Sequence, residues 1–233
     1  MNTLSTTTIA PEVIADQTQW HKVAKELEGE NIKLMSYDKT LFAELGDVRG
    51  KNILDYGAGP GVLASVLKRL GANVKAYDIN AEMREKSAEK IGIENVYERL
   101  EDIPKDPFDV VICNLVLCIV PEQEAKNILS VLKSVVNPSG QVYIGFCNPK
   151  IHNVPESQLD FRFYSGKTYS ENHSYRKIKK EGIYEIMENH RPVEWYARAF
   201  HEAGLVLLDI ILTPQYQIRN DIIHDFIIFK LAK

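Results

Sequence analysis

Apolar and polar residues alternate along the middle of the chain with two different periods. Short apolar runs, which are typical of buried strands, occur at 53–56, 74–77, 110–113 and 141–147. Longer segments with apolar residues at helical spacing separate these runs, at 62–70, 81–91 and 122–136. A weaker strand is expected at 96–97. This alternation of strand and helix predicts a parallel sheet with helices on both faces.

Both ends of the chain depart from this pattern. Residues 1–16 are rich in Thr and Ser, so we expect a loose tail there, followed by one or two helices within 17–45. Near the other end we expect a helix at 193–203 and two apolar strands at 205–212 and 222–231. The polar join between these strands is too short for a crossover helix, so the pair is expected to be antiparallel.

The segment 148–189 has no helical period and is crowded with Tyr, His, Asn and charged residues. A stretch this long inside one domain usually has structure of its own or a function, often as a lid. Its basic residues, Arg162, Arg176 and the run 177–180, would attract an acidic substrate, although a solvated face is the favoured interpretation.

Composition narrows the class of protein. The 233 residues are 45% hydrophobic and include 28 Lys or Arg against 32 Asp or Glu, which is ordinary for a globular protein with one elaborated domain. The mild acidity argues against nonspecific nucleic-acid binding. No apolar run approaches the roughly 18 residues of a membrane helix, and residues 1–10 lack signal-peptide features. The three cysteines have no CxxC or paired spacing, which predicts free thiols and a cytoplasmic protein.

The segment 53–63 reads ILDYGAGPGVL, a buried strand that enters three alternating glycines and then a helix. Glycine allows a sharp turn and close approach of a ligand, and a helix start offers free N–H groups. The spacing GxGxG differs from the dinucleotide fingerprint GxGxxG, because Val62 follows Gly61. Asp55 would accept a hydrogen bond from a ligand ammonium and repel a pyrophosphate. The loop therefore favours a nucleoside that carries an amino acid.

The second predicted strand ends with Tyr77-Asp78-Ile79. An acidic residue at this position can accept both hydroxyls of a ribose, and Ile79 could pack on an adenine. A glycine loop alone is often a plain turn, but the loop together with Asp78 predicts a nucleoside site.

With these motifs, residues 20–231 resemble the class I S-adenosylmethionine-dependent methyltransferases. The resemblance implies an α/β, Rossmann-like, doubly wound seven-stranded sheet with an antiparallel last strand, N-terminal helices and an inserted substrate lid. It implies S-adenosyl-L-methionine as the cofactor of an enzyme. The chain then divides into a tail with cap helices (1–45), a cofactor-binding core (46–147), an inserted lid and substrate region (148–191) and the end of the core (192–233).

The same resemblance assigns cofactor contacts. The methionine part would be held by Asp55, Tyr56, Gly57, Ala58, Gly59 and Gly61, with Asn114 nearby after the fourth strand. Asp78 would bind the ribose, and Ile79 and Leu100 would line the adenine pocket. The chain departs from the family at Arg99, where small-molecule members carry Asp. A guanidinium only donates hydrogen bonds, so Glu98 or Glu101 would have to accept from the adenine amino group.

On the substrate side, His190-Arg191-Pro192 resembles a motif of a branch similar to ubiquinone and menaquinone biosynthesis methyltransferases. His190 is the catalytic candidate as a general base, and a structural hydrogen bond that fixes the lid is the equal alternative. Further candidates for substrate contact are Tyr37, Tyr164, Tyr169 and Arg191, although such tyrosines as often form a small core. The histidines lack metal-ligand spacing, so no metal is predicted.

The predicted function is transfer of a methyl group from S-adenosylmethionine to an O, N or C nucleophile of a small-molecule acceptor. We expect a monomer or homodimer, with no nucleic-acid or membrane partner. A protein or peptide methyltransferase and a non-catalytic S-adenosylmethionine-binding regulator are the alternatives. Nucleic-acid amino methylation is disfavoured, because residues 114–117 read NLVL where an Asn-or-Asp-Pro-Pro-aromatic motif would stand. The glycine spacing disfavours a nicotinamide-dependent oxidoreductase.

Overall fold

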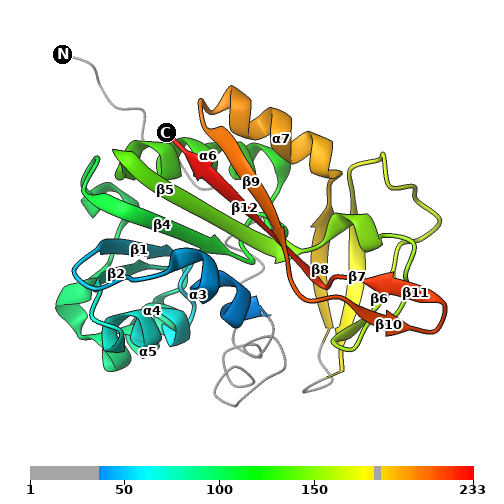
Figure 1. Cartoon of the computed structure of the whole chain (residues 1–233), viewed down its shortest axis with the longest axis horizontal. Coiled ribbons are helices and arrows are strands. Elements are labelled where there is room, and N and C mark those ends of the chain that lie inside the picture. Colours follow the sequence, from blue (N-terminus) through cyan, green and yellow to red (C-terminus); the bar gives the residue numbers. More distant parts are fainter. Residues whose placement is uncertain (1–36, 181–184) are drawn as a thin grey trace.

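A seven-stranded sheet forms the centre of the protein (Figure 1). The computed structural model describes residues 37–180 and 185–233. The strand order is β3-β2-β1-β4-β5-β12-β9. These strands are β1 (Asn52–Tyr56), β2 (Asn73–Tyr77), β3 (Val96–Tyr97), β4 (Phe108–Asn114), β5 (Val136–Cys147), β9 (Val206–Leu212) and β12 (Phe226–Ala232). Strand β12 is antiparallel to both of its neighbours, β5 and β9, whereas β1 to β5 are mutually parallel. The predicted seven-stranded sheet with an antiparallel last strand is confirmed.

Helices cover both faces of the sheet (Figure 1). They are α3 (Lys39–Leu45), α4 (Val62–Arg69), α5 (Ala81–Ile91), α6 (Glu122–Val135) and α7 (Val193–Glu202), with short 3-10 turns η2 (Ile93–Asn95), η3 (Leu100–Asp102) and η4 (Pro149–Ile151). Successive side chains of a strand point to opposite faces. Accordingly, Ile53 of β1 packs with apolar residues of α3 and α4, while Leu54 packs with those of α6 and α7. The helices predicted from the apolar spacing after residue 50 are confirmed to within one residue at each end.

The segment 148–189 has more regular structure than its sequence indicated. It contains a three-stranded antiparallel sheet of β6 (Asp160–Phe163), β7 (His173–Lys179) and β8 (Glu185–His190). In β7 the side chains alternate, since Tyr175 and Lys177 are buried while Ser174 and Arg176 are exposed. A period of two was therefore present, but the buried face carries polar groups instead of aliphatic ones. This small sheet projects from the main sheet beyond the ends of β5 and β12 (Figure 1).

The connection between the last two sheet strands also differs from expectation. It contains a hairpin of β10 (Tyr216–Ile218) and β11 (Asp221–Ile223), which pair antiparallel. The expected single strand at 222–231 is therefore wrong, because Ile222 and Ile223 belong to the hairpin and β12 begins at Phe226. The antiparallel pairing of β9 with β12 is confirmed.

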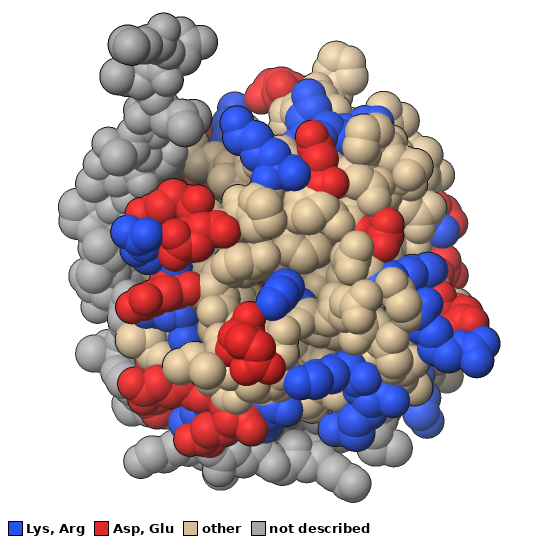
Figure 2. Space-filling view, turned by 90° about the vertical axis from the view of Figure 1, so that its left-hand side faces the viewer, with Lys and Arg blue, Asp and Glu red and all other residues tan. Residues whose placement is uncertain are grey.

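The tail expected at 1–16, and the helical pattern before residue 37, lie outside the described residues. Helix α3 is the described part of the helical region expected at 17–45. Within the described residues, no helix is long and apolar enough to cross a membrane. Figure 2 shows acidic and basic side chains both spread around a largely uncharged centre on the face that it presents.

Candidate active site

The glycine loop joins β1 to α4 with all three glycines at positive φ: 73° at Gly57, 55° at Gly59 and 74° at Gly61. A Cβ on Gly57 would overlap the Val116 side chain, and one on Gly61 would lie 2.8 Å from the Cα of Ser87 in α5. Gly61 therefore allows α4 and α5 to pack closely. A Cβ on Gly59, by contrast, would meet no atom within 4 Å apart from those of its neighbours in the chain. The loop is thus tightly packed at both ends and open in its middle.

Asp78 at the tip of β2 connects this loop to the next strand. Its Oδ2 accepts a hydrogen bond from the Gly59 N–H at 2.8 Å, and its Oδ1 accepts one from the Asn80 N–H at 2.9 Å. Burial raises the pKa of Asp78, while these two backbone donors oppose that shift. The structure brings the glycine loop and Asp78 together.

The other predicted cofactor contacts surround this loop. Backbone N–H groups of Gly57 and Ala58 both donate to the Tyr77 carbonyl, at 2.7 and 3.0 Å, and the Tyr56 ring lies 5.3 Å from the Tyr77 ring. Ile79, in the segment after β2, and Leu100, the first residue of η3, are half-buried.

Arg99, which departs from the family pattern, pairs with two acidic residues that follow it in the chain. Its guanidinium forms an ion pair with Asp102 at 2.9 Å and a longer one with Glu101 at 3.7 Å. Its side chain is 64% exposed, and the two neighbouring carboxylates orient the guanidinium.

Tyr37 contacts the cofactor candidate Asn114 and lies outside the residues that line the pocket described below. Its hydroxyl donates to Asn114 Oδ1 at the carboxyl end of β4, and its ring packs edge-on against Phe226 at 5.1 Å. The ring is fully buried and lies against Gly145, so a side chain at position 145 would overlap Tyr37. Burial raises the pKa of Tyr37, and the negative charges of Asp38 and Asp55 add to the shift. Asp55 is itself buried in β1.

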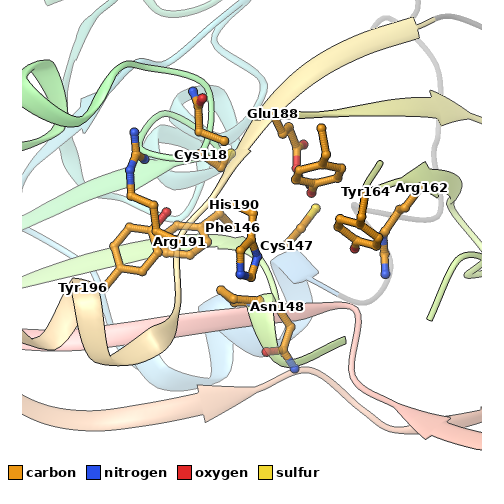
Figure 3. A pocket seen from close by; sticks show the side chains of 13 residues that line it. Cys118, Phe146, Cys147, Asn148, Arg162, Tyr164, Glu188, His190, Arg191 and Tyr196 are labelled. Carbon is orange, nitrogen blue, oxygen red and sulfur yellow. Dashed lines mark hydrogen bonds between the residues drawn. The ribbon is translucent and has the colours of Figure 1, made fainter. Parts of the chain in front are cut away.

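A pocket lies beyond the carboxyl ends of β4 and β5, between the loop after β4 and the small sheet (Figure 3). Its volume is about 10 Å³, which is the space of about one water molecule. The lining residues are Cys118, Phe146, Cys147, Asn148, Pro149, Arg162, Tyr164, Tyr175, Glu188, Asn189, His190, Arg191 and Tyr196.

His190 lines this pocket as a neutral imidazole. Its Nε2 lies 2.7 Å from the Tyr169 carbonyl oxygen, and because a carbonyl only accepts, Nε2 carries the proton and Nδ1 keeps a lone pair. Its ring packs at 4.5 Å from the His152 ring and 5.0 Å from the His173 ring. Burial lowers the pKa of His190 to about 4, and the neighbouring histidines contribute to the shift.

Arg191 stabilises the loop after β4. Its Nη1 and Nη2 donate to the carbonyl oxygens of Leu117 and Val120, at 2.7 and 2.6 Å. Its guanidinium also lies over the Trp195 ring at 4.9 Å. Arg191 lines the pocket, and Figure 3 shows its guanidinium directed away from Tyr164 and Arg162. A substrate contact by Arg191 stays a prediction.

The two remaining tyrosine candidates differ in position. Tyr164 lines the pocket, where its ring packs 4.1 Å from His152 and 4.8 Å from Tyr175, and burial raises its pKa to about 12. Tyr169 lies outside the lining. Its hydroxyl donates to Glu194 at 2.9 Å and accepts the Val193 N–H at 3.0 Å, which caps the start of α7.

Sequence reasoning missed the charged residues beside the pocket. Lys177 is fully buried, with its Nζ 2.6 Å from Glu188 Oε1, 3.6 Å from Asp160 Oδ2 and 2.9 Å from Cys147 Sγ. The Tyr175 hydroxyl donates to the other Glu188 oxygen at 2.6 Å. The solvated face expected for Arg162, Arg176 and 177–180 is therefore wrong for Lys177 and for Arg162, both of which are buried. The signal was the alternation in β8, which places Glu188 on the same buried face as His190.

Within residues 37–180 and 185–233, no three His, Cys, Asp or Glu side chains group in a way that could hold a metal ion.

The chain is similar in sequence to known proteins. A family model described as "Methyltransferase domain" matches residues 20–210. A ubiquinone biosynthesis O-methyltransferase from Shewanella pealeana is 26% identical over 153 residues, which cover 62% of this chain and 64% of that protein. A ribosomal protein L11 methyltransferase from Burkholderia thailandensis is 33% identical over 97 residues, 40% of this chain and 31% of that protein. This chain thus spans less than two thirds of the length of both curated relatives.

A solved structure extends the comparison to the whole fold. The 1,6-didemethyltoxoflavin-N1-methyltransferase of Burkholderia thailandensis, with bound 1,6-didemethyltoxoflavin and S-adenosylhomocysteine, matches with a TM-score of 0.60 at 15% identity. The match covers 99% of this chain and 93% of that one. The protein belongs to the methyltransferase-domain family, which confirms the resemblance seen in the glycine loop and Asp78.

Proposed function

We propose that this protein transfers a methyl group from S-adenosyl-L-methionine to an O, N or C nucleophile of a small-molecule acceptor. The observation that carries this proposal is the position of two sites at one edge of the sheet. Strands β2, β1, β4 and β5 are adjacent and parallel, so their carboxyl ends place the glycine loop, Asp78 and the pocket along one edge. Methyl transfer needs a donor and an acceptor held in contact, and two sites along one edge of the sheet support that arrangement.

The glycine loop and its neighbours form the cofactor site in this proposal. Each Asp78 oxygen accepts one backbone N–H and retains a lone pair for a ribose hydroxyl. Open space at Gly59 lets a ligand approach the backbone. The methionine part lies against Asp55, the segment 56–61 and Asn114.

The adenine would lie between Ile79 and Leu100, both half-buried. Because Arg99 is paired with Asp102, Glu98 or Glu101 supplies the acceptor for the adenine amino group. When bound, the cofactor supplies an electrophilic methyl group, so the protein mainly has to orient the nucleophile and exclude water.

His190 orients the acceptor in this scheme. Its Nδ1 lone pair accepts a hydrogen bond from an O–H or N–H of the acceptor, because Nε2–H is held by the Tyr169 carbonyl. With a pKa of about 4, the imidazole is unprotonated throughout the neutral range. Its role should therefore persist from about pH 6 to 8.

A small acceptor is favoured over a protein or peptide by the likeness to the 1,6-didemethyltoxoflavin-N1-methyltransferase, which holds a small molecule. In this chain the candidate acceptor pocket is bounded by bonds between the small sheet and the loop after β4. Asn189 of β8 closes it by donating its backbone N–H to the Cys118 carbonyl at 2.6 Å and its side-chain N–H to the Val120 carbonyl at 3.1 Å. Together with Arg191, these bonds join the small sheet to the loop after β4. An acceptor enters this space of about 10 Å³ only if a lining side chain moves. A cytoplasmic location and a monomeric or homodimeric state stay predictions.

Calorimetric titration with S-adenosylmethionine, S-adenosylhomocysteine and NAD tests the cofactor class. Micromolar binding of the two adenosyl ligands without NAD supports the proposal, and binding of NAD alone contradicts it. Formation of S-adenosylhomocysteine with a panel of phenols, amines and acids then separates an enzyme from a binding regulator. Tight cofactor binding with no turnover on any acceptor would favour the regulator.

A further inference from the structure

Arg162 is a buried cation in the wall of the pocket. It lies on β6, is 3% exposed and lines the cavity on the side opposite Arg191 (Figure 3). Its Nε is 2.8 Å from Asp160 Oδ1, and its Nη2 is 3.6 Å from Asp225 Oδ1. The second distance is too long for a hydrogen bond.

Asp160 and Asp225 pair electrostatically with this guanidinium, but its N–H donors make no well-aligned hydrogen bond. Within the described residues, Nε, Nη1 and Nη2 of Arg162 are all buried without a hydrogen bond of good geometry, and so is Asp225 Oδ1. A guanidinium has five N–H donors arranged to bind a carboxylate through two parallel bonds. Buried donors without partners are costly, and in the wall of a pocket they point to a ligand.

The other charged residues that line the pocket, Glu188 and Arg191, are already hydrogen-bonded within the protein. Glu188 is occupied at both oxygens, by Lys177 at 2.6 Å and by the Tyr175 hydroxyl at 2.6 Å. Arg191 is occupied by the carbonyl oxygens of the loop after β4. Arg162 is therefore the charged group whose hydrogen-bonding capacity is available in this wall.

Aromatic rings form much of the remaining lining. They are Phe146, Tyr164, Tyr175 and Tyr196. Flat aromatic walls favour a flat unsaturated ligand through stacked or edge-on ring contacts. Because the volume of the pocket is only about 10 Å³, such a ligand has to displace a side chain. Tyr164 is the half-buried member of the set, and ring contacts to His152 and Tyr175 position it.

We propose that the methyl acceptor is a planar, aromatic acid whose carboxylate is bound by the guanidinium of Arg162. This inference rests on the proposed function in one respect, which is that the ligand is the methyl acceptor. The anion site itself does not require the cofactor. The ligand carboxylate faces Nη1 and Nη2 of Arg162, where it competes with the Asp225 carboxylate for the guanidinium. The ring lies between Tyr164 and the end of β5.

Matched pairs of acids and amides test this site by calorimetry on the full chain. The probes are 3,4-dihydroxybenzoate against 3,4-dihydroxybenzamide, and cinnamate against cinnamamide, each with and without saturating S-adenosylhomocysteine. Amides keep the shape and lose the charge, so the acids should bind about tenfold to a hundredfold more tightly, as for hydrogen bonds to a charged group. Absence of this preference in both pairs, or no binding of any acid, would overturn the inference.

Three substitutions sharpen the test. Arg162→Gln should abolish the preference for the acid, whereas Arg176→Gln, at an exposed arginine of β7 paired with Glu185, should retain it. Asp225→Asn should strengthen acid binding several-fold, because it removes the competing carboxylate 3.6 Å from Nη2. If Arg162→Gln alone does not fold, Arg162→Gln with Asp225→Asn keeps the buried charge balanced and carries the same expectation.

The possible failures are distinguishable. Binding of S-adenosylhomocysteine without acid preference contradicts the anion site and leaves the methyltransferase proposal intact. Acid preference that depends on Arg162, without binding of S-adenosylhomocysteine, contradicts the methyltransferase proposal and leaves the anion site. Equal loss in the Arg162→Gln and Arg176→Gln variants would show a general charge effect and overturn the inference.

Discussion

Alanine at Gly61 and at Gly59 should have different consequences, although the two residues share one loop. At Gly61, φ is 74° and a Cβ would lie 2.8 Å from the Ser87 Cα and 2.6 Å from its Oγ. The left-handed conformation costs a non-glycine residue about 1–2 kcal/mol, and overpacking against a backbone atom adds about 1–3 kcal/mol. Gly61→Ala should therefore lower the free energy of unfolding by about 2–5 kcal/mol.

At Gly59, φ is 55° and a Cβ meets nothing within 4 Å, so only the conformational cost of about 1–2 kcal/mol applies. The added methyl group would instead occupy the space through which the ligand approaches. Gly59→Ala should thus weaken S-adenosylhomocysteine binding at least about tenfold, or about 1.4 kcal/mol.

Urea unfolding followed by circular dichroism measures the stability of each variant, and calorimetry measures ligand affinity at a temperature where both variants are folded. Equal stability losses in the two variants would refute the packing argument for Gly61. Unchanged affinity in Gly59→Ala would refute the assignment of its open side to the cofactor.

Three further predictions follow from the same geometry. Asp78→Ala should weaken cofactor binding by about 1–3 kcal/mol through lost hydrogen bonds, measured by calorimetry, and unchanged affinity would reject the ribose role. Lys177→Met should lower the free energy of unfolding in urea by about 3–5 kcal/mol, because it leaves Glu188 buried without its cation. The control Lys180→Met removes a partly exposed ion pair with Glu156 and should cost less than about 1 kcal/mol. Similar losses in the two variants would contradict this account. The folded-state pKa of His190, about 4, lies below the usual 6.5, so the unfolded chain binds a proton first as pH falls. Stability should therefore be lost between about pH 6.5 and 4, by up to about 3 kcal/mol, and His190→Phe should flatten this part of the profile; an unchanged slope would show that other groups cause it.

The sequence by itself determined the framework of this protein. Strand and helix positions from 52 to 147 follow from local hydrophobic periods, which a continuous segment encodes without reference to the rest of the chain. The glycine loop and Asp78 were also readable, because each lies where a strand ends. Parallel pairing of β1 with β2 then brings them together, as the Gly59–Asp78 hydrogen bond shows.

The pocket was decided by the tertiary structure. Tyr37 and Tyr169 are tyrosines of the kind that contacts substrates, yet their partners, Asn114 and Glu194, are 77 and 25 residues away in sequence. The sequence around Lys177 resembles a solvated charged face until β6 and β8 bring Asp160 and Glu188 against it. A polar side chain is buried only where distant segments supply its partners, so its role depends on contacts that no local pattern contains.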